Sequence, residues 1–103
     1  MNKINQLIQG SIDMHVHANP DICLKHPQTK SNDDIINQCI NAGMNGIVLK
    51  THGWPSVALA HQLNKQYPNF KIYPSISLNR VAGGPYPWVV EMAIEMGVKV
   101  IWL

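Results

Sequence analysis

Four short segments with the pattern of β-strands, separated by stretches with helical spacing, constrain the fold of this chain most strongly. Apolar and polar residues alternate over residues 12–17, and the other predicted strands occupy residues 46–52, 71–78 and 99–103. The intervening stretches place apolar residues on one helix face and occupy residues 31–43, 55–67 and 87–97. Strands that alternate with helices over short connections form parallel sheets through right-handed crossovers. The sequence therefore predicts an α/β fold of parallel βα units.

Capping and proline signals indicate where the helices begin. Ser31 followed by Asp34 forms a capping pattern. Pro55 and Pro87 suit the first turn of a helix, where a missing N–H group costs no hydrogen bond. A short leading helix is predicted over residues 4–8. The apolar positions of the last helix are Val89, Val90, Ala93, Ile94 and Met96.

Length and charge exclude several classes of protein. The 103 residues suit one domain, and a net charge of +2 with Arg80 as the only arginine gives no basic stripe for nucleic acid. No apolar run reaches the roughly 20 residues of a membrane-spanning helix, and the N-terminus lacks a signal-peptide pattern. Cys23 and Cys39 lack CxxC spacing, so we expect reduced thiols in a cytoplasmic protein.

The first strand carries a pattern that is typical of metal sites. Asp13, His15 and His17 are two residues apart and therefore share one face of the strand, with the histidines at its carboxyl end. Ligands bind at that end in parallel α/β folds. Two neutral imidazoles at this spacing can bind one divalent cation. Asp13, one step deeper, is a candidate additional ligand or a carboxylate that orients a histidine ring.

The next two strands also become polar toward their carboxyl ends. Lys50 and His52 share one face of the second strand, and Ser77 and Asn79 share one face of the third. A lysine after an apolar run needs a polar, solvated or paired environment. Lys50 is therefore expected to clamp a charge, to act as a general base, or to pair with Asp13. Because all three strands become polar on one face toward the same end, we predict a site that they share.

Two stretches of the chain resemble known hydrolase families. Residues 12–17 (IDMHVH) resemble the opening motif of the amidohydrolase superfamily and of the polymerase-and-histidinol-phosphatase (PHP) families. Residues 43–52 resemble the second PHP motif, usually T-D-H, with Thr51 in place of the acid. The whole chain, including residues 77–80 and Gly83-Gly84, looks most like an uncharacterised amidohydrolase-like family with H-V-H and L-K-[ST]-H signatures.

This resemblance implies a metal-dependent hydrolase that cleaves an amide, ester or related C–N, C–O or P–O bond of a small-molecule substrate. The metal would be zinc, with manganese, iron and nickel as alternatives. By the resemblance, His15 and His17 are ligands, and His52 is a ligand or a contact to the transition state. Lys50 and His52 are the candidate catalytic residues. The candidate substrate contacts are Ser77, Asn79 and Arg80.

The resemblance also implies a (β/α)8 TIM-type barrel, which typically needs about 250 residues. We therefore expect residues 1–103 to form a partial domain, the N-terminal half with strands one to four. A second hypothesis is a non-catalytic metal- or ligand-binding half-barrel whose exposed edges associate into homo-oligomers. A third is an open flavodoxin-like sheet that binds a small anion, although residues 18–21 are not a glycine-rich turn.

Overall fold

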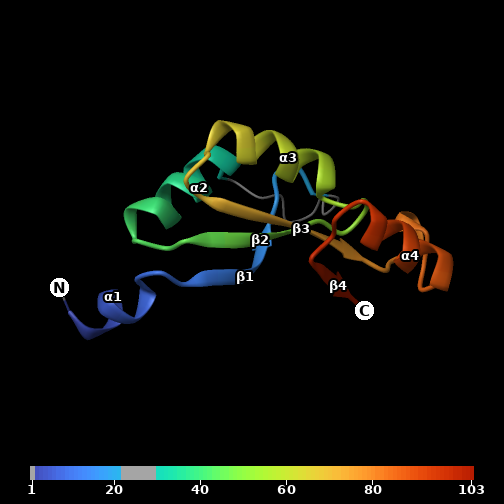
Figure 1. The fold of residues 1–103 in the computed structure, drawn as a ribbon, viewed down its shortest axis with the longest axis horizontal. Coiled ribbons are helices and arrows are strands. Elements are labelled where there is room, and N and C mark those ends of the chain that lie inside the picture. The colour runs from blue at the N-terminus through green and yellow to red at the C-terminus, as the bar shows by residue number, and fades with distance from the viewer. Residues whose placement is uncertain (1, 22–29) are drawn as a thin grey trace.

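A computed structural model describes residues 2–21 and 30–103 of the chain. Strands and helices alternate, as the sequence predicts (Figure 1). The described strands are β1 (Ile12–His17), β2 (Gly46–Lys50), β3 (Lys71–Ser77) and β4 (Val100–Trp102). The described helices are α1 (Lys3–Ile8), α2 (Asn32–Asn41), α3 (Val57–Gln66), α4 (Pro87–Glu95) and a 3-10 turn, η1 (Arg80–Ala82).

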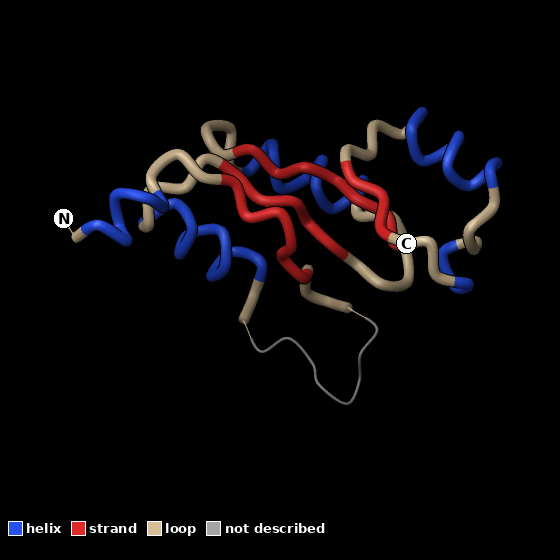
Figure 2. The backbone as a smooth tube through the Cα atoms, turned by 90° about the horizontal axis from the view of Figure 1, so that it is seen from below, coloured by secondary structure: helices blue, strands red, loops and turns tan. Residues whose placement is uncertain are grey.

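The strands are parallel and lie side by side in chain order, β1-β2-β3-β4 (Figure 2). A doubly wound sheet of the flavodoxin type has strand order 2-1-3-4-5, so the consecutive order excludes that hypothesis for the described strands. In a flat sheet, β1 and β4 would lie about 14 Å apart, three strand spacings. The rings of His15 on β1 and Trp102 on β4 nevertheless have centroids 5.1 Å apart. The sheet is therefore curled, and the predicted half-barrel is confirmed.

Helices α2, α3 and α4 cover the convex face of this sheet in two groups. In Figure 1, α2 and α3 lie over β1, β2 and β3, and α4 lies beside the end of β3 and β4. The first group packs on a core that includes Val16, Ile36, Ile47, Leu49, Ala60, Leu63 and Ile72. The second packs on Ile76, Val89 and Ala93, with Ile101 partly buried against them. Because side chains alternate along a strand, the neighbours of these core residues face the concave side.

The helix starts follow the sequence signals with one exception. The Ser31 side chain accepts a hydrogen bond from the Asp34 backbone N–H at 3.1 Å, and Pro87 lies in the first turn of α4, so both predictions are confirmed. Pro55 precedes α3, which begins at Val57 after Ser56. The Ser56 hydroxyl is held by the ends of β2 and β3, and the helix therefore begins one residue beyond it.

Only some of the apolar positions of α4 are buried. Val89 and Ala93 are four residues apart and pack on β3 and β4. Ile94 and Met96 are also apolar, but they are 61% and 44% exposed and do not belong to the face that packs on the sheet. Each residue turns the helix by about 100°, so Ile94 points away from the face that Ala93 buries.

Among the described residues, no helix is long and apolar enough to cross a membrane.

Candidate metal centre

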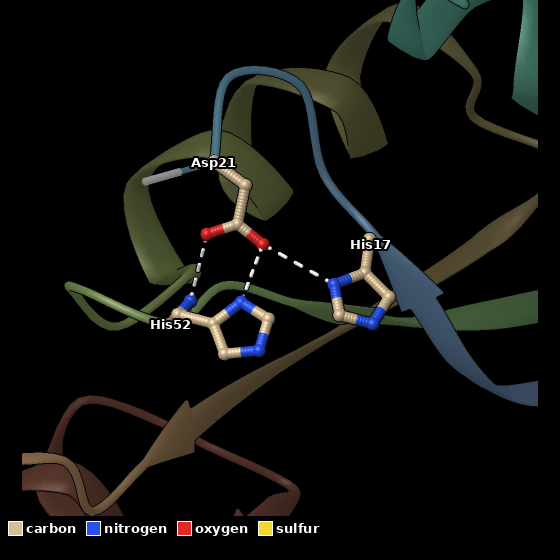
Figure 3. A group of neighbouring side chains, drawn as sticks. All are labelled: His17, Asp21 and His52. Atoms are coloured by element: carbon tan, nitrogen blue, oxygen red, sulfur yellow. Dashed lines mark hydrogen bonds and ion pairs between the residues drawn. The ribbon is translucent and has the colours of Figure 1, made fainter. Parts of the chain in front are cut away.

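The candidate site is organised by Asp21, in the segment that follows β1. One oxygen of its carboxylate accepts the backbone N–H of His52 at 3.0 Å. The other lies 3.2 Å from Nδ1 of His17 and 2.7 Å from Nδ1 of His52 (Figure 3). The Asp21 side chain is 8% exposed, whereas the two imidazoles are 40% and 37% exposed. A buried carboxylate therefore joins the carboxyl ends of β1 and β2, and the rings remain accessible from solvent.

His15 extends this group along β1. Its Nε2 atom lies 3.1 Å from Nε2 of His17, and the ring centroids are 5.0 Å apart. The ring of His17 also stacks on that of His52, with centroids 4.9 Å apart. Two nitrogen ligands of one tetrahedral zinc ion lie about 3.3 Å apart when each bond is about 2.05 Å. The spacing of the His15 and His17 nitrogens therefore suits a shared metal ion.

The residues present fit a divalent metal in two arrangements. His17, Asp21 and His52 can each offer one ligand atom within 4.8 Å of the others, so the carboxylate itself can be a ligand. Alternatively, Asp21 holds Nδ1 of the two imidazoles, which leaves their Nε2 atoms for the metal; carboxylates orient metal-bound histidines in this way. Imidazole with carboxylate suits zinc, iron, manganese or nickel, so the donor set does not define the metal.

The pKa of His15 lies below its usual value of 6.5. The main cause is reduced hydration of the ring, which disfavours its charged form, and the positive charge of Lys50 is the second. Asp13 acts in the opposite direction. His15 therefore favours the neutral form, which is the form that binds metals.

The other predicted residues of the first two strands surround this centre. The carboxylate of Asp13 accepts the backbone N–H of His15 at 3.0 Å. The Nζ atom of Lys50 lies over the ring of Trp102, 4.5 Å from the centroid. The predicted alternative of a Lys50–Asp13 ion pair is not formed within the described residues.

The predicted substrate contacts on and after β3 have different environments. Ser77 is 5% exposed, and its hydroxyl has no hydrogen-bond partner among the described residues. The Asn79 amide donates to the His52 carbonyl at 2.9 Å, so His52 is held by Asn79 as well as by Asp21. Arg80 is exposed in η1, and within residues 2–21 and 30–103 its guanidinium has no hydrogen bond or ion pair.

Sequence reasoning missed two participants, Asp21 and Trp102. Asp21 follows His17 by four residues. An acidic residue just beyond a strand that ends in histidine is the sequence signal that could have identified it. No sequence signal points to Trp102, because its contact with His15 arises only from the curl of the sheet. Cys39 packs partly buried against the core, and burial raises the pKa of its thiol. Cys23 lies outside the described residues.

Comparison with known proteins defines the family of the chain. Residues 10–103 match a family described as "Family of unknown function (DUF6282)". The chain belongs to this family. The DUF6282 match includes every residue of β1 to β4 and Asp21, so the strands and the candidate site all lie inside the family region. No curated protein and no solved structure matches the chain.

Proposed function

We propose that this chain forms the metal-binding half-barrel of a metal-dependent hydrolase. Its substrate is a small molecule with an amide, ester or related C–N, C–O or P–O bond. The supporting observation is that His17 and His52 meet on one carboxylate, Asp21, with His15 alongside. These residues lie at the carboxyl end of parallel strands, where such folds bind ligands.

In this proposal a divalent metal, zinc in the first instance, lowers the pKa of a bound water and polarises the bond to be cleaved. The Nε2 atoms of His15 and His17 hold the metal, since they already lie 3.1 Å apart. Asp21 accepts the Nδ1–H groups of His17 and His52, which fixes both rings in the tautomer with Nε2 free to bind.

His52 has two roles open to it. It is the third ligand if its Nε2 atom reaches the metal, and otherwise it contacts the reacting group of the substrate. The backbone of His52 is held at N–H by Asp21 and at C=O by Asn79. That double anchoring supports either role, because both need a ring in a fixed position.

Metal content tests the proposal. Native mass spectrometry of the purified protein should show bound divalent metal, and the double variant His15→Ala, His17→Ala should lose it. His61→Ala is the matched control, because His61 is exposed in the middle of α3. The protein is then assayed with a panel of esters, amides and phosphoesters. Metal content that is equal in all three proteins would refute the metal centre.

The alternative function is a non-catalytic metal-binding half-barrel that associates with a second copy. It is favoured by one observation: within the described residues, β1 and β4 each pair with a neighbour along one edge only. On β1, Ile12 and Met14 are also 41% and 53% exposed. Open, apolar edges favour association. A metal-bearing dimer that hydrolyses none of the panel would support this alternative over the hydrolase.

A further inference from the structure

Two buried polar atoms on the concave face lack hydrogen-bond partners among the described residues: the Ser77 hydroxyl and the Trp102 indole Nε1. The two residues are register partners on β3 and β4 and therefore share a face of the sheet. The preceding residue of each, Ile76 and Ile101, packs on the side of α4. Ser77 and Trp102 consequently face away from the helices. Buried polar groups without partners are uncommon in native proteins and require an explanation.

The same indole is in contact with the candidate metal centre. The Trp102 ring centroid lies 5.1 Å from that of His15 and 4.5 Å from the Lys50 ammonium. No ion pair joins Lys50 to a carboxylate in the part of the chain that the structure describes. A positive charge, two unsatisfied donors and a flat apolar ring therefore lie together, next to a predicted metal ligand.

We propose that Lys50, Ser77 and Trp102 form a subsite for a carboxylate group of the substrate. This inference rests on the proposed function and names its substrate class: a small acid whose scissile bond lies over the metal. The ammonium supplies one positive charge, and the hydroxyl and indole N–H supply two neutral donors for the carboxylate oxygens.

A single negative charge matches this donor set better than a phosphate dianion. Phosphate sites typically combine several cations or a row of backbone N–H groups, and here Lys50 is the cation at the indole. The two donor atoms are buried as the side chains stand. In this proposal the carboxylate binds with a rearrangement of the Lys50 side chain, which lies over the indole ring and has a flexible four-carbon stem.

The test measures binding of propionate to the full chain by ligand-observed NMR, on the protein as purified and again after metal removal. Propionamide, a neutral analogue of similar shape, and inorganic phosphate are titrated in parallel. We expect propionate to bind more tightly than either, and to bind with the metal removed. A propionate affinity no greater than that of propionamide, or below that of phosphate, overturns the carboxylate subsite.

Variants then assign the binding to the three residues. Lys50→Met should weaken propionate binding about tenfold, the effect of losing one charge-assisted hydrogen bond. Lys50→Arg should retain most of the binding. Ser77→Ala and Trp102→Phe each remove one neutral donor and should weaken it several-fold. Lys65→Met is the matched control, because Lys65 is exposed on α3. Circular dichroism confirms that each variant is folded.

The two proposals fail in different ways. If the purified protein holds no metal but binds propionate in a Lys50-dependent manner, the hydrolase proposal is wrong and the anion subsite stands. If metal is present and Lys50→Met leaves propionate binding unchanged, the subsite is wrong and the metal centre stands. Propionate binding that disappears with the metal also overturns the subsite, because the carboxylate then binds the ion rather than these side chains.

Discussion

Asp21 and His52 are 31 residues apart in the sequence, yet the carboxylate of Asp21 contacts His52 at both its backbone N–H and its Nδ1 atom, at 3.0 and 2.7 Å. The same carboxylate reaches Nδ1 of His17 at 3.2 Å. One side chain thus positions two imidazoles that come from different strands. We therefore expect metal binding at the candidate centre to depend on this residue as much as on the histidines.

Asp21→Asn should weaken metal binding about 10- to 100-fold, the loss typical when a partner of metal-bound histidines is removed. The amide is neutral and has one acceptor oxygen, so it cannot accept both the His52 backbone N–H and the Nδ1–H groups of the two rings, which bond to different oxygens of Asp21. Affinity is measured by competition with a chromophoric zinc chelator. If Asp21 is itself a ligand, the same variant loses affinity and also changes the coordination seen by X-ray absorption.

Asp34→Asn is the matched control for this variant. Asp34 is an exposed carboxylate in the first turn of α2, and within the described residues no ion pair joins it to a histidine. Its change to asparagine removes the same charge from the chain and should leave zinc affinity unchanged. Equal losses in both variants would mean that net charge, rather than the contacts of Asp21, governs binding.

Lys50→Met should raise the pKa of His15 in the metal-free protein. Lys50 is the second cause of the lowered pKa, and reduced hydration of the ring is the first, so the pKa should rise but stay below 6.5. Because folding lowers this pKa, the neutral ring of His15 contributes to the free energy of unfolding above pH 6.5. This contribution is lost as the pH falls through the pKa of His15 in the folded protein. The variant should therefore lose less stability on acidification.

The measurement is an NMR titration of the histidine ring protons, with His61→Ala used to identify the resonance of the exposed helix histidine. Urea denaturation on both sides of pH 6.5 gives the stability difference. If the pKa of His15 is unchanged or lower in Lys50→Met, the charge of Lys50 does not act on His15. The Lys50 ammonium would then not lie over Trp102.

Much of the centre follows from the two-residue period of strands. Alternation predicts that His15 and His17 share a face and that polar residues meet at the carboxyl ends of parallel strands. The pairing register shifts between Asp13 and Val16, and the carboxylate of Asp13 bonds to the backbone of its own strand, at His15. A period cannot reveal such a local irregularity.

The remaining features depend on tertiary structure. Asp21 lies beyond the strand, where no periodicity applies, and its position depends on contacts with His52 from the next βα unit. The contact of Trp102 with His15 depends on the curl of the sheet across β1 to β4. The alternation of side chains places residues on a face of the sheet, but it does not give how far that face closes.

Ser56→Ala should destabilise the fold by about 1–3 kcal/mol, the cost of leaving a buried donor unsatisfied. The buried Ser56 hydroxyl donates to the Leu49 carbonyl at 2.6 Å and accepts the Ser75 backbone N–H at 2.9 Å, beyond the last pairing of β2 with β3. Urea denaturation should show a lower midpoint with an unchanged slope. Ser11→Ala is the control, since the Ser11 side chain makes no hydrogen bond within the described residues, and should change stability by less than about 0.5 kcal/mol. Equal midpoints for the two variants would contradict this role for Ser56.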